Sequence, residues 1–142
     1  MTHVIPFRHE LYPFTGIYRN VNGHQMHALD EGSEGSGDTV IMLHGNPTWS
    51  FYFRNLVLGL RDTHRVLVPD HIGCGLSAKP DEKSYEYTLR RRVDDLAALV
   101  EQAGVRGRIT LLMHDWGGMI TVSPLPSLPS SSASIWWPFT FR

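Results

Sequence analysis

Short apolar runs along the chain alternate with longer segments of mixed polarity. Three of the runs have the length of a strand, and an unbroken apolar run of this length is typical of a strand buried on both faces. They cover residues 39–43, 65–69 and 109–113. Before them, two extended segments flank Asn22-Gly23, a pair that favours a tight hairpin turn. The pattern predicts an N-terminal hairpin followed by three buried strands.

Apolar residues recur at helical spacing in the two segments between these strands. In the first segment they are Phe53, Leu56, Val57 and Leu60, and in the second they are Leu89, Val93, Leu96, Leu99 and Val100. Thr88 is placed to cap the start of the second helix and Gly104 its end. Apolar strands that alternate with amphipathic helices predict an α/β fold, in which helices cover both faces of a mostly parallel sheet.

The loops that leave the three buried strands start at His44, Asp70 and His114. The carboxyl ends of parallel strands lie at one edge of the sheet, and ligands bind beyond that edge in such folds. We therefore expect the three loops to converge on one candidate site.

Asp115 holds the most informative position in these loops. It stands between a buried strand and Gly117-Gly118, a pair suited to a tight turn into a helix. Such a turn lifts one side chain off the end of a sheet, and a carboxylate in that position can attack carbon as a nucleophile. An Asp at the start of a helix more often serves as the N-cap, so these residues alone leave both interpretations open.

Composition and charge exclude several classes of protein. A chain of 142 residues, 42% hydrophobic and 19% charged, corresponds to one globular domain. Its formal net charge of −1 provides no positive surface for nucleic acid or an anionic membrane. No apolar run approaches the ~18 residues of a membrane span, and the polar N-terminus does not resemble a signal peptide. Cys74 is the only cysteine and forms no internal disulfide, so we expect a cytoplasmic protein.

The sequence contains no motif for a cofactor or a metal ion. His24 and His27 have the spacing of metal ligands, but no third ligand stands near them. The glycine-rich residues 32–37 lack the Lys-Ser/Thr of a phosphate-binding loop. We therefore expect neither a cofactor nor a metal.

The character of the chain changes after Ile120. Residues 121–142 are rich in serine and proline and contain no acidic residue and no histidine. We expect this tail to be disordered and non-homologous to the rest, the result of a shifted reading frame or a mispredicted gene end. Trp136-Trp137 suggests the alternative of an aromatic anchor for a partner.

Three motifs together resemble one known family. They are HGNPTWS at residues 44–50, DHIGCGLS at residues 70–77 and HDWGG at residues 114–118. In this order, each at the end of a predicted strand, they resemble the haloalkane dehalogenase group of α/β-hydrolases, which includes relatives that act on β-lactones. The resemblance covers residues 16–120, so residues 1–120 are interpreted as the N-terminal part of a truncated α/β-hydrolase core with an N-terminal hairpin, flanking helices and no cap domain.

The resemblance assigns a role to three residues. Asp115 would be the nucleophile, forming an ester with a small apolar haloalkane or a β-lactone that water later hydrolyses. Backbone N–H groups of Trp116 and Asn46 would form the oxyanion hole, and the Asn46 amide and Trp116 indole would hold the departing halide. Two features depart from the pattern: Met113 stands where a small residue is usual, and His114 favours the alternative of an epoxide hydrolase-like enzyme.

The chain lacks the residues that complete this mechanism. In the family a histidine base and its acidic partner follow the nucleophile, but residues 116–142 contain neither. His44 and His114 are interpreted as packing and hydrogen-bonding residues rather than as the base. We expect a chain that at most stops at an ester on Asp115, with an exposed strand edge at residues 109–113, marginal stability and no evident partner. The alternative from another class is a non-catalytic fragment or partner-binding module.

Overall fold

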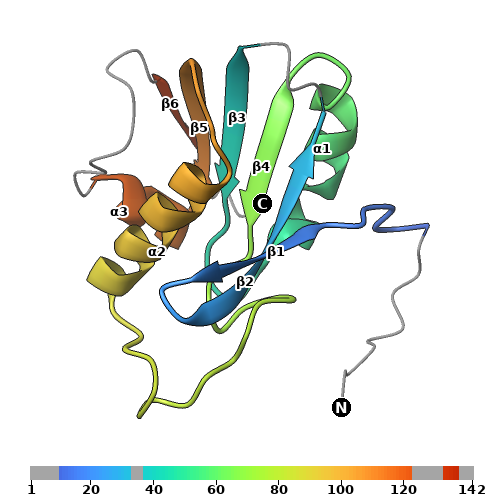
Figure 1. The fold of residues 1–142 in the computed structure, drawn as a ribbon. Helices are drawn as coiled ribbons and strands as arrows, with labels where there is room; N and C mark the ends of the chain where they lie inside the picture. The colour runs from blue at the N-terminus through green and yellow to red at the C-terminus, as the bar shows by residue number, and fades with distance from the viewer. Residues whose placement is uncertain (1–9, 33–36, 123–132, 138–142) are drawn as a thin grey trace, which may run out of the picture.

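A single sheet of six strands, in the order β1-β2-β4-β3-β5-β6, organises the chain (Figure 1). The structure is a computed structural model that describes residues 10–32, 37–122 and 133–137. The strands are β1 (Ile17–Val21), β2 (His24–Glu31), β3 (Asp38–Leu43), β4 (Arg65–Pro69), β5 (Arg108–His114) and β6 (Ala133–Trp137). β1, β2 and β4 pair antiparallel, whereas β3 pairs parallel with both β4 and β5. The predicted α/β fold with an N-terminal hairpin is confirmed.

The predicted hairpin joins β1 and β2 through Asn22-Gly23. Both residues have positive φ, 48° at Asn22 and 91° at Gly23. A two-residue turn with positive φ at both positions matches the right-handed twist of the strands it joins, and Asn-Gly is the pair that adopts it at least cost. The turn sets the register of the hairpin, in which Val21 lies opposite His24.

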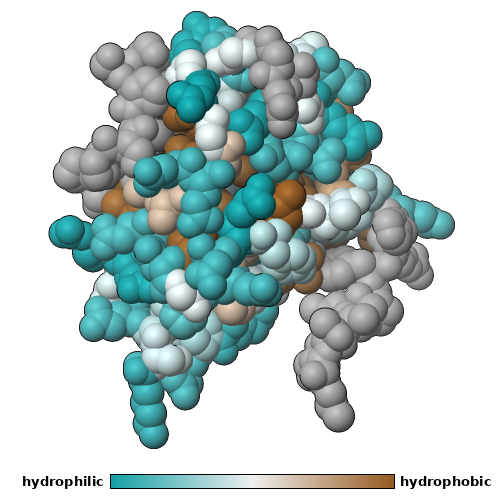
Figure 2. Space-filling view, in the orientation of Figure 1, coloured by the Kyte–Doolittle hydropathy of each residue, from teal (hydrophilic) through white to brown (hydrophobic). Residues whose placement is uncertain are grey.

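Helices cover both faces of the sheet. They are η1 (Ser50–Phe53), α1 (Arg54–Leu60), α2 (Leu89–Gln102) and α3 (Trp116–Val122). The strands alternate between two cores: Ile41 of β3 packs with the buried face of α2, and its neighbour Met42 packs with Phe53 and Val57. Figure 1 shows α1 on the opposite side of the sheet from α2. The surface over α2 is mainly hydrophilic with small apolar patches, as expected of an amphipathic helix (Figure 2).

α2 begins and ends where its sequence predicts. The Thr88 hydroxyl accepts a hydrogen bond from the Arg91 N–H at 3.2 Å, which is the bond of an N-cap. Gly104 follows the helix with φ of 61°, the left-handed conformation that glycine adopts freely at a helix end. None of the helices in the described residues is long and apolar enough to span a bilayer.

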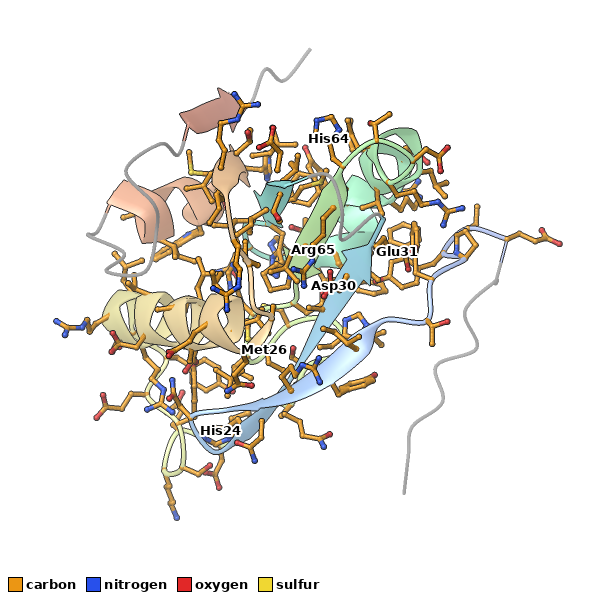
Figure 3. All side chains as sticks on the ribbon, turned by 45° about the horizontal axis from the view of Figure 1, so that its top comes forward. His24, Met26, Asp30, Glu31, His64 and Arg65 are labelled. Atoms are coloured by element: carbon orange, nitrogen blue, oxygen red, sulfur yellow. The ribbon has the colours of Figure 1, made fainter. Side chains whose placement is uncertain are left out.

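A partly buried ion pair joins β4 to β2 at the end of the sheet opposite the three loops. Arg65 contacts the Asp30 carboxylate through Nε at 2.9 Å and Nη2 at 2.8 Å, and Nη2 also donates to the Ala103 carbonyl at 2.7 Å. Figure 3 shows Arg65 and Asp30 side by side on their neighbouring strands. A two-point contact of this kind is stronger than an ordinary surface ion pair, because guanidinium and carboxylate are both held.

The structure corrects two expectations about the tail. Residues 133–137, expected to be disordered, form β6, and β6 pairs parallel with β5 from Thr110 opposite Ala133 to His114 opposite Trp137. β5 is therefore an interior strand and not an exposed edge. The composition of the tail predicted disorder because serine and proline dominate it, whereas strand pairing depends on a neighbouring edge that composition does not reveal. Thr121 and Val122, the first two residues of the expected tail, end α3. The rest of the expectation falls on residues 123–132 and 138–142, which lie outside the described residues.

Candidate active site

Asp115 stands on a strained turn between β5 and α3. Its φ is +54°, in the left-handed region that a non-glycine residue enters at a cost of about 1 kcal/mol or more. Its carbonyl accepts a hydrogen bond from the Gly118 N–H at 2.9 Å, which closes the turn. An N-cap residue usually has extended backbone angles, so this conformation favours the interpretation in which the turn lifts the carboxylate off the sheet. The side chain is exposed.

The turn can form only because glycines stand at two positions. A Cβ at Gly45 would lie 2.5 Å from both Cβ and Oδ2 of Asp115. A Cβ at Gly117 would lie 2.2 Å from the backbone oxygen of Leu43. The larger Met113 does not prevent the turn, because its side chain is buried in the core on the α2 side of the sheet.

The loop after β3 brings Asn46 to the Asp115 carboxylate. The Asn46 N–H donates to Oδ2 of Asp115 at 3.2 Å, although 69 positions separate the two residues. The Asn46 side chain also contacts Cys74, whose thiol donates to Asn46 Oδ1 at 3.9 Å. Trp116 follows Asp115 at the start of α3, and its side chain is 41% exposed. The structure thus places the predicted nucleophile, Asn46 and Trp116 in one region.

His44 uses both of its ring nitrogens inside the protein. Nδ1 donates to the Gly45 carbonyl at 2.8 Å, and Nε2 accepts from the His71 N–H at 3.0 Å. Burial lowers the pKa of His44 and outweighs the opposite effect of the bond to Gly45. Burial likewise holds the pKa of His71 well below its usual value. A histidine with both nitrogens engaged cannot accept a proton from water, so His44 is not a candidate base.

His114 is also part of the packing of the site. Its side chain is 3% exposed, and its ring stacks on Tyr52 with a centroid separation of 4.6 Å. Tyr52 lies on η1, which continues from the Asn46 loop. The stack therefore connects the end of β5, directly before Asp115, to the segment that follows the Asn46 loop.

Asp70 is fully buried and bonds to residues of several segments around the site. Its carboxylate accepts hydrogen bonds from the Ser50 N–H at 2.7 Å and the Leu76 N–H at 2.9 Å, and it lies 2.9 Å from His27 Nδ1. Burial alone would raise the pKa of Asp70, but the contact with His27 and these N–H groups more than offset it, so the pKa lies below its ordinary value. Because Ser50 follows the Asn46 loop, Asp70 holds two of the three converging loops together.

The described residues hold no metal centre at this site. No group of His, Cys, Asp or Glu in residues 10–32, 37–122 and 133–137 is arranged to hold a metal ion. A cavity of about 330 Å³ lies at the other end of the sheet, beside Asp38, Arg65 and Gly104. It is therefore separate from Asp115.

Sequence reasoning did not predict the contacts of His44 and Cys74. A His-Gly pair at the end of a buried strand is the only local signal for the first contact. The partners of the ring come from the neighbouring loop at His71, so they depend on packing that no local pattern encodes. The Cys74 thiol reaches Asn46 for the same reason.

Comparison with known proteins places the chain in a family. Residues 38–126, more than half of the chain, match the family model described as the alpha/beta hydrolase fold. The chain belongs to the α/β-hydrolase family, and its relatives include oxetan-2-one decarboxylases and haloalkane dehalogenases.

Two curated relatives and one solved structure show the likeness. A cis-3-alkyl-4-alkyloxetan-2-one decarboxylase of Shewanella oneidensis is 56% identical over 110 residues, which is 78% of this chain and 34% of that protein. Haloalkane dehalogenase 2 of Mycobacterium tuberculosis is 35% identical over 114 residues, which is 80% of this chain and 38% of that protein. The haloalkane dehalogenase DpaA from Paraglaciecola agarilytica superposes with a TM-score of 0.72 at 32% identity, covering 79% of this chain and 38% of that one. The chain thus spans about a third of the length of these relatives.

Proposed function

We propose that Asp115 is the nucleophile of a hydrolase that acts on an electrophilic carbon. The observation that carries the proposal is the position of its carboxylate, lifted on a left-handed turn with Oδ2 3.2 Å from the Asn46 N–H. Because Oδ2 is held by this donor, Oδ1 is the oxygen directed at substrate. Oδ1 forms a bond to carbon as the carbon–halogen bond breaks, and the halide leaves with the bonding electrons.

We assign the stabilisation of the departing anion to Asn46 and Trp116. The Asn46 amide and the Trp116 indole are neutral N–H donors, and both residues flank Asp115 in the fold. Neutral donors stabilise a developing anion without forming an ion pair with the nucleophile, as a lysine or arginine beside Asp115 would. The exposed position of the Trp116 side chain leaves its indole accessible to a ligand.

The 142-residue chain by itself is expected to stop at the ester. Hydrolysis of the ester needs a base to activate water, and residues 116–142 contain no Asp, Glu or His. His44 cannot take the role, because both of its ring nitrogens are hydrogen-bonded. We therefore propose that each chain forms one ester on Asp115 and does not turn over repeatedly.

A β-lactone is the substrate class that the sequence likeness favours. The oxetanone decarboxylases of Shewanella oneidensis and Xanthomonas campestris are 56% and 52% identical to this chain, against 35% for the M. tuberculosis dehalogenase. An oxetan-2-one is a β-lactone. Oδ1 attacks the ring carbon that bears the lactone's alkyl oxygen, the bond between that carbon and the oxygen breaks, and its electron pair forms a carboxylate that stays attached to the opened, ester-bound substrate. Chemically this is the same displacement, with a carboxylate in place of the halide.

Intact-mass measurement tests the proposal. The chain is incubated separately with a primary haloalkane, a cis-dialkyl β-lactone and a terminal epoxide. We expect one adduct per chain with the β-lactone or the haloalkane, and faster formation with the β-lactone. An adduct with the epoxide alone would show that the substrate class is an epoxide rather than a haloalkane or β-lactone. Steady release of many halide ions per chain would refute the single event, and the absence of any adduct would favour the non-catalytic alternative.

A further inference from the structure

The carbonyl oxygen of Gly45 receives an unusual number of hydrogen bonds. The Nδ1–H of His44 donates to it at 2.8 Å, the Thr48 hydroxyl at 3.0 Å and the Thr48 N–H at 3.2 Å. A carbonyl oxygen has two lone pairs, so three donors leave it little freedom to turn. His44 itself is fully buried, which fixes the direction from which its proton arrives.

The same peptide group carries the N–H of Asn46. A peptide unit is planar, and in the trans form its C=O and N–H point in opposite directions. The cis bond in this loop is the next one, Asn46–Pro47, so the Gly45–Asn46 peptide is trans. Holding the Gly45 oxygen on one side therefore aims the Asn46 N–H to the other side, where Oδ2 of Asp115 lies at 3.2 Å.

We propose that His44 and Thr48 are positioning residues, which hold the Asn46 N–H on Oδ2 of Asp115 through the Gly45 carbonyl. The catalytic consequence rests on the proposed function. Once Oδ1 of Asp115 is esterified, Oδ2 is the oxygen that becomes negatively charged when a nucleophile attacks the ester. A donor already aligned with Oδ2 stabilises that charge without rearrangement, and losing one such donor costs about 100-fold or more in rate.

Two variants of His44 separate positioning from packing. In His44→Asn, the amide nitrogen occupies roughly the place of Nδ1 and still donates to Gly45. In His44→Gln, the longer side chain presents an oxygen near the place of Nε2, which still accepts from His71 but leaves Gly45 without this donor. Each variant keeps one of the two bonds of the ring, 2.8 Å to Gly45 or 3.0 Å to His71. Thr48→Val and Thr48→Ser form a second pair, of which only Ser keeps the hydroxyl donor.

Hydroxylamine provides a reaction that needs no histidine base. After the ester on Asp115 has formed, hydroxylamine attacks its carbonyl carbon, a hydroxamate forms, and the alcohol leaves. We expect this step to slow about 10-fold in His44→Gln and Thr48→Val and to stay near the wild-type rate in His44→Asn and Thr48→Ser. Equal rates within each pair, after correction for stability, would overturn the proposal.

An NMR measurement tests the positioning without any reaction. The amide signal of Asn46 should shift when the carboxylate is replaced in Asp115→Asn, because its N–H points at that carboxylate. The amplitude of this shift should fall in Thr48→Val and His44→Gln and persist in the partner variants. An unchanged amplitude would overturn the positioning. The absence of an ester in the wild-type chain would instead overturn only the proposed function, so the two failures are distinguishable.

Discussion

The backbone nitrogen of Asn46 lies 3.2 Å from Oδ2 of Asp115, although the two residues are 69 positions apart. The contact follows from the sheet, in which β3 and β5 are parallel neighbours with Leu43 opposite Met113. β3 ends at Leu43, three residues before Asn46, and β5 ends at His114, directly before Asp115, so both loops leave the sheet at the same level. A donor and a carboxylate are thereby held together by the strand register and not by local sequence.

Replacing Gly45 by alanine should disturb the carboxylate directly. The new Cβ would lie 2.5 Å from Oδ2 of Asp115, closer than atoms can approach, so the carboxylate or the loop must shift. We expect ester formation to slow by about 100-fold, since misplacing a reacting group by ~1 Å can cost that much. Mass spectrometry against time measures the rate.

Gly59→Ala is the matched control for this substitution. Gly59 lies on α1, where an added Cβ meets nothing within 4 Å. We expect an unchanged rate of ester formation and a gain of about 0.5–1 kcal/mol in the free energy of unfolding, because alanine favours a helix. An equal loss of rate in both variants would contradict the steric explanation.

Asp70 should make folding stability depend on pH in the acid range. Its pKa in the folded protein is below its ordinary value, so its contribution is complete above about pH 4 and is lost as the pH falls through the folded-state pKa. We expect Asp70→Asn to cost about 3 kcal/mol at pH 7, since the amide can accept at only one of the two oxygen positions, which bond Ser50 on one side and His27 and Leu76 on the other. At about pH 2 the difference from the wild type should narrow. Urea unfolding at both pH values measures it.

Asp94→Asn controls for the loss of a charge. The Asp94 side chain is 51% exposed and pairs with Arg90 at 3.3 Å across one helical turn. An exposed pair of this kind contributes about 0.5 kcal/mol or less, so we expect little change in the free energy of unfolding at either pH. A constant difference between Asp70→Asn and the wild type across the pH range would show that the Asp70 effect is not linked to its protonation.

β6 should protect the edge of β5. A chain that ends at residue 132 lacks the strand Ala133–Trp137, whereas a chain that ends at residue 137 keeps it. We expect the shorter chain to unfold at lower urea concentration and to aggregate, because an apolar strand with unpaired backbone groups is a template for association. Light scattering and urea unfolding compare the two chains. Identical behaviour would show that the β5–β6 pairing contributes nothing to stability.

Local patterns in the sequence predicted most of the fold. The hairpin at Asn22-Gly23, the buried strands and α2 with its caps at Thr88 and Gly104 all depend on neighbours in the chain, which a sequence displays. β6 could not be predicted in this way, because its partner is the edge of β5 and its own residues carry no apolar periodicity.

The candidate site was likewise predictable from local sequence only in part. Three motifs at strand ends indicated that the loops converge, and the structure brings Asn46 to Asp115. The orientation of the loop was not predictable, because it depends on a buried imidazole placed between Gly45 and His71. The roles of Asp115, Asn46 and Trp116 in catalysis stay predictions.

The location of the adduct tests the central claim most directly. After incubation with a β-lactone or a haloalkane, peptide mapping by tandem mass spectrometry identifies the modified residue in the wild-type chain and in Asp115→Asn. We predict a single ester on Asp115 in the wild-type chain and no adduct in Asp115→Asn. An adduct on another residue, or equal modification of both chains, would contradict it.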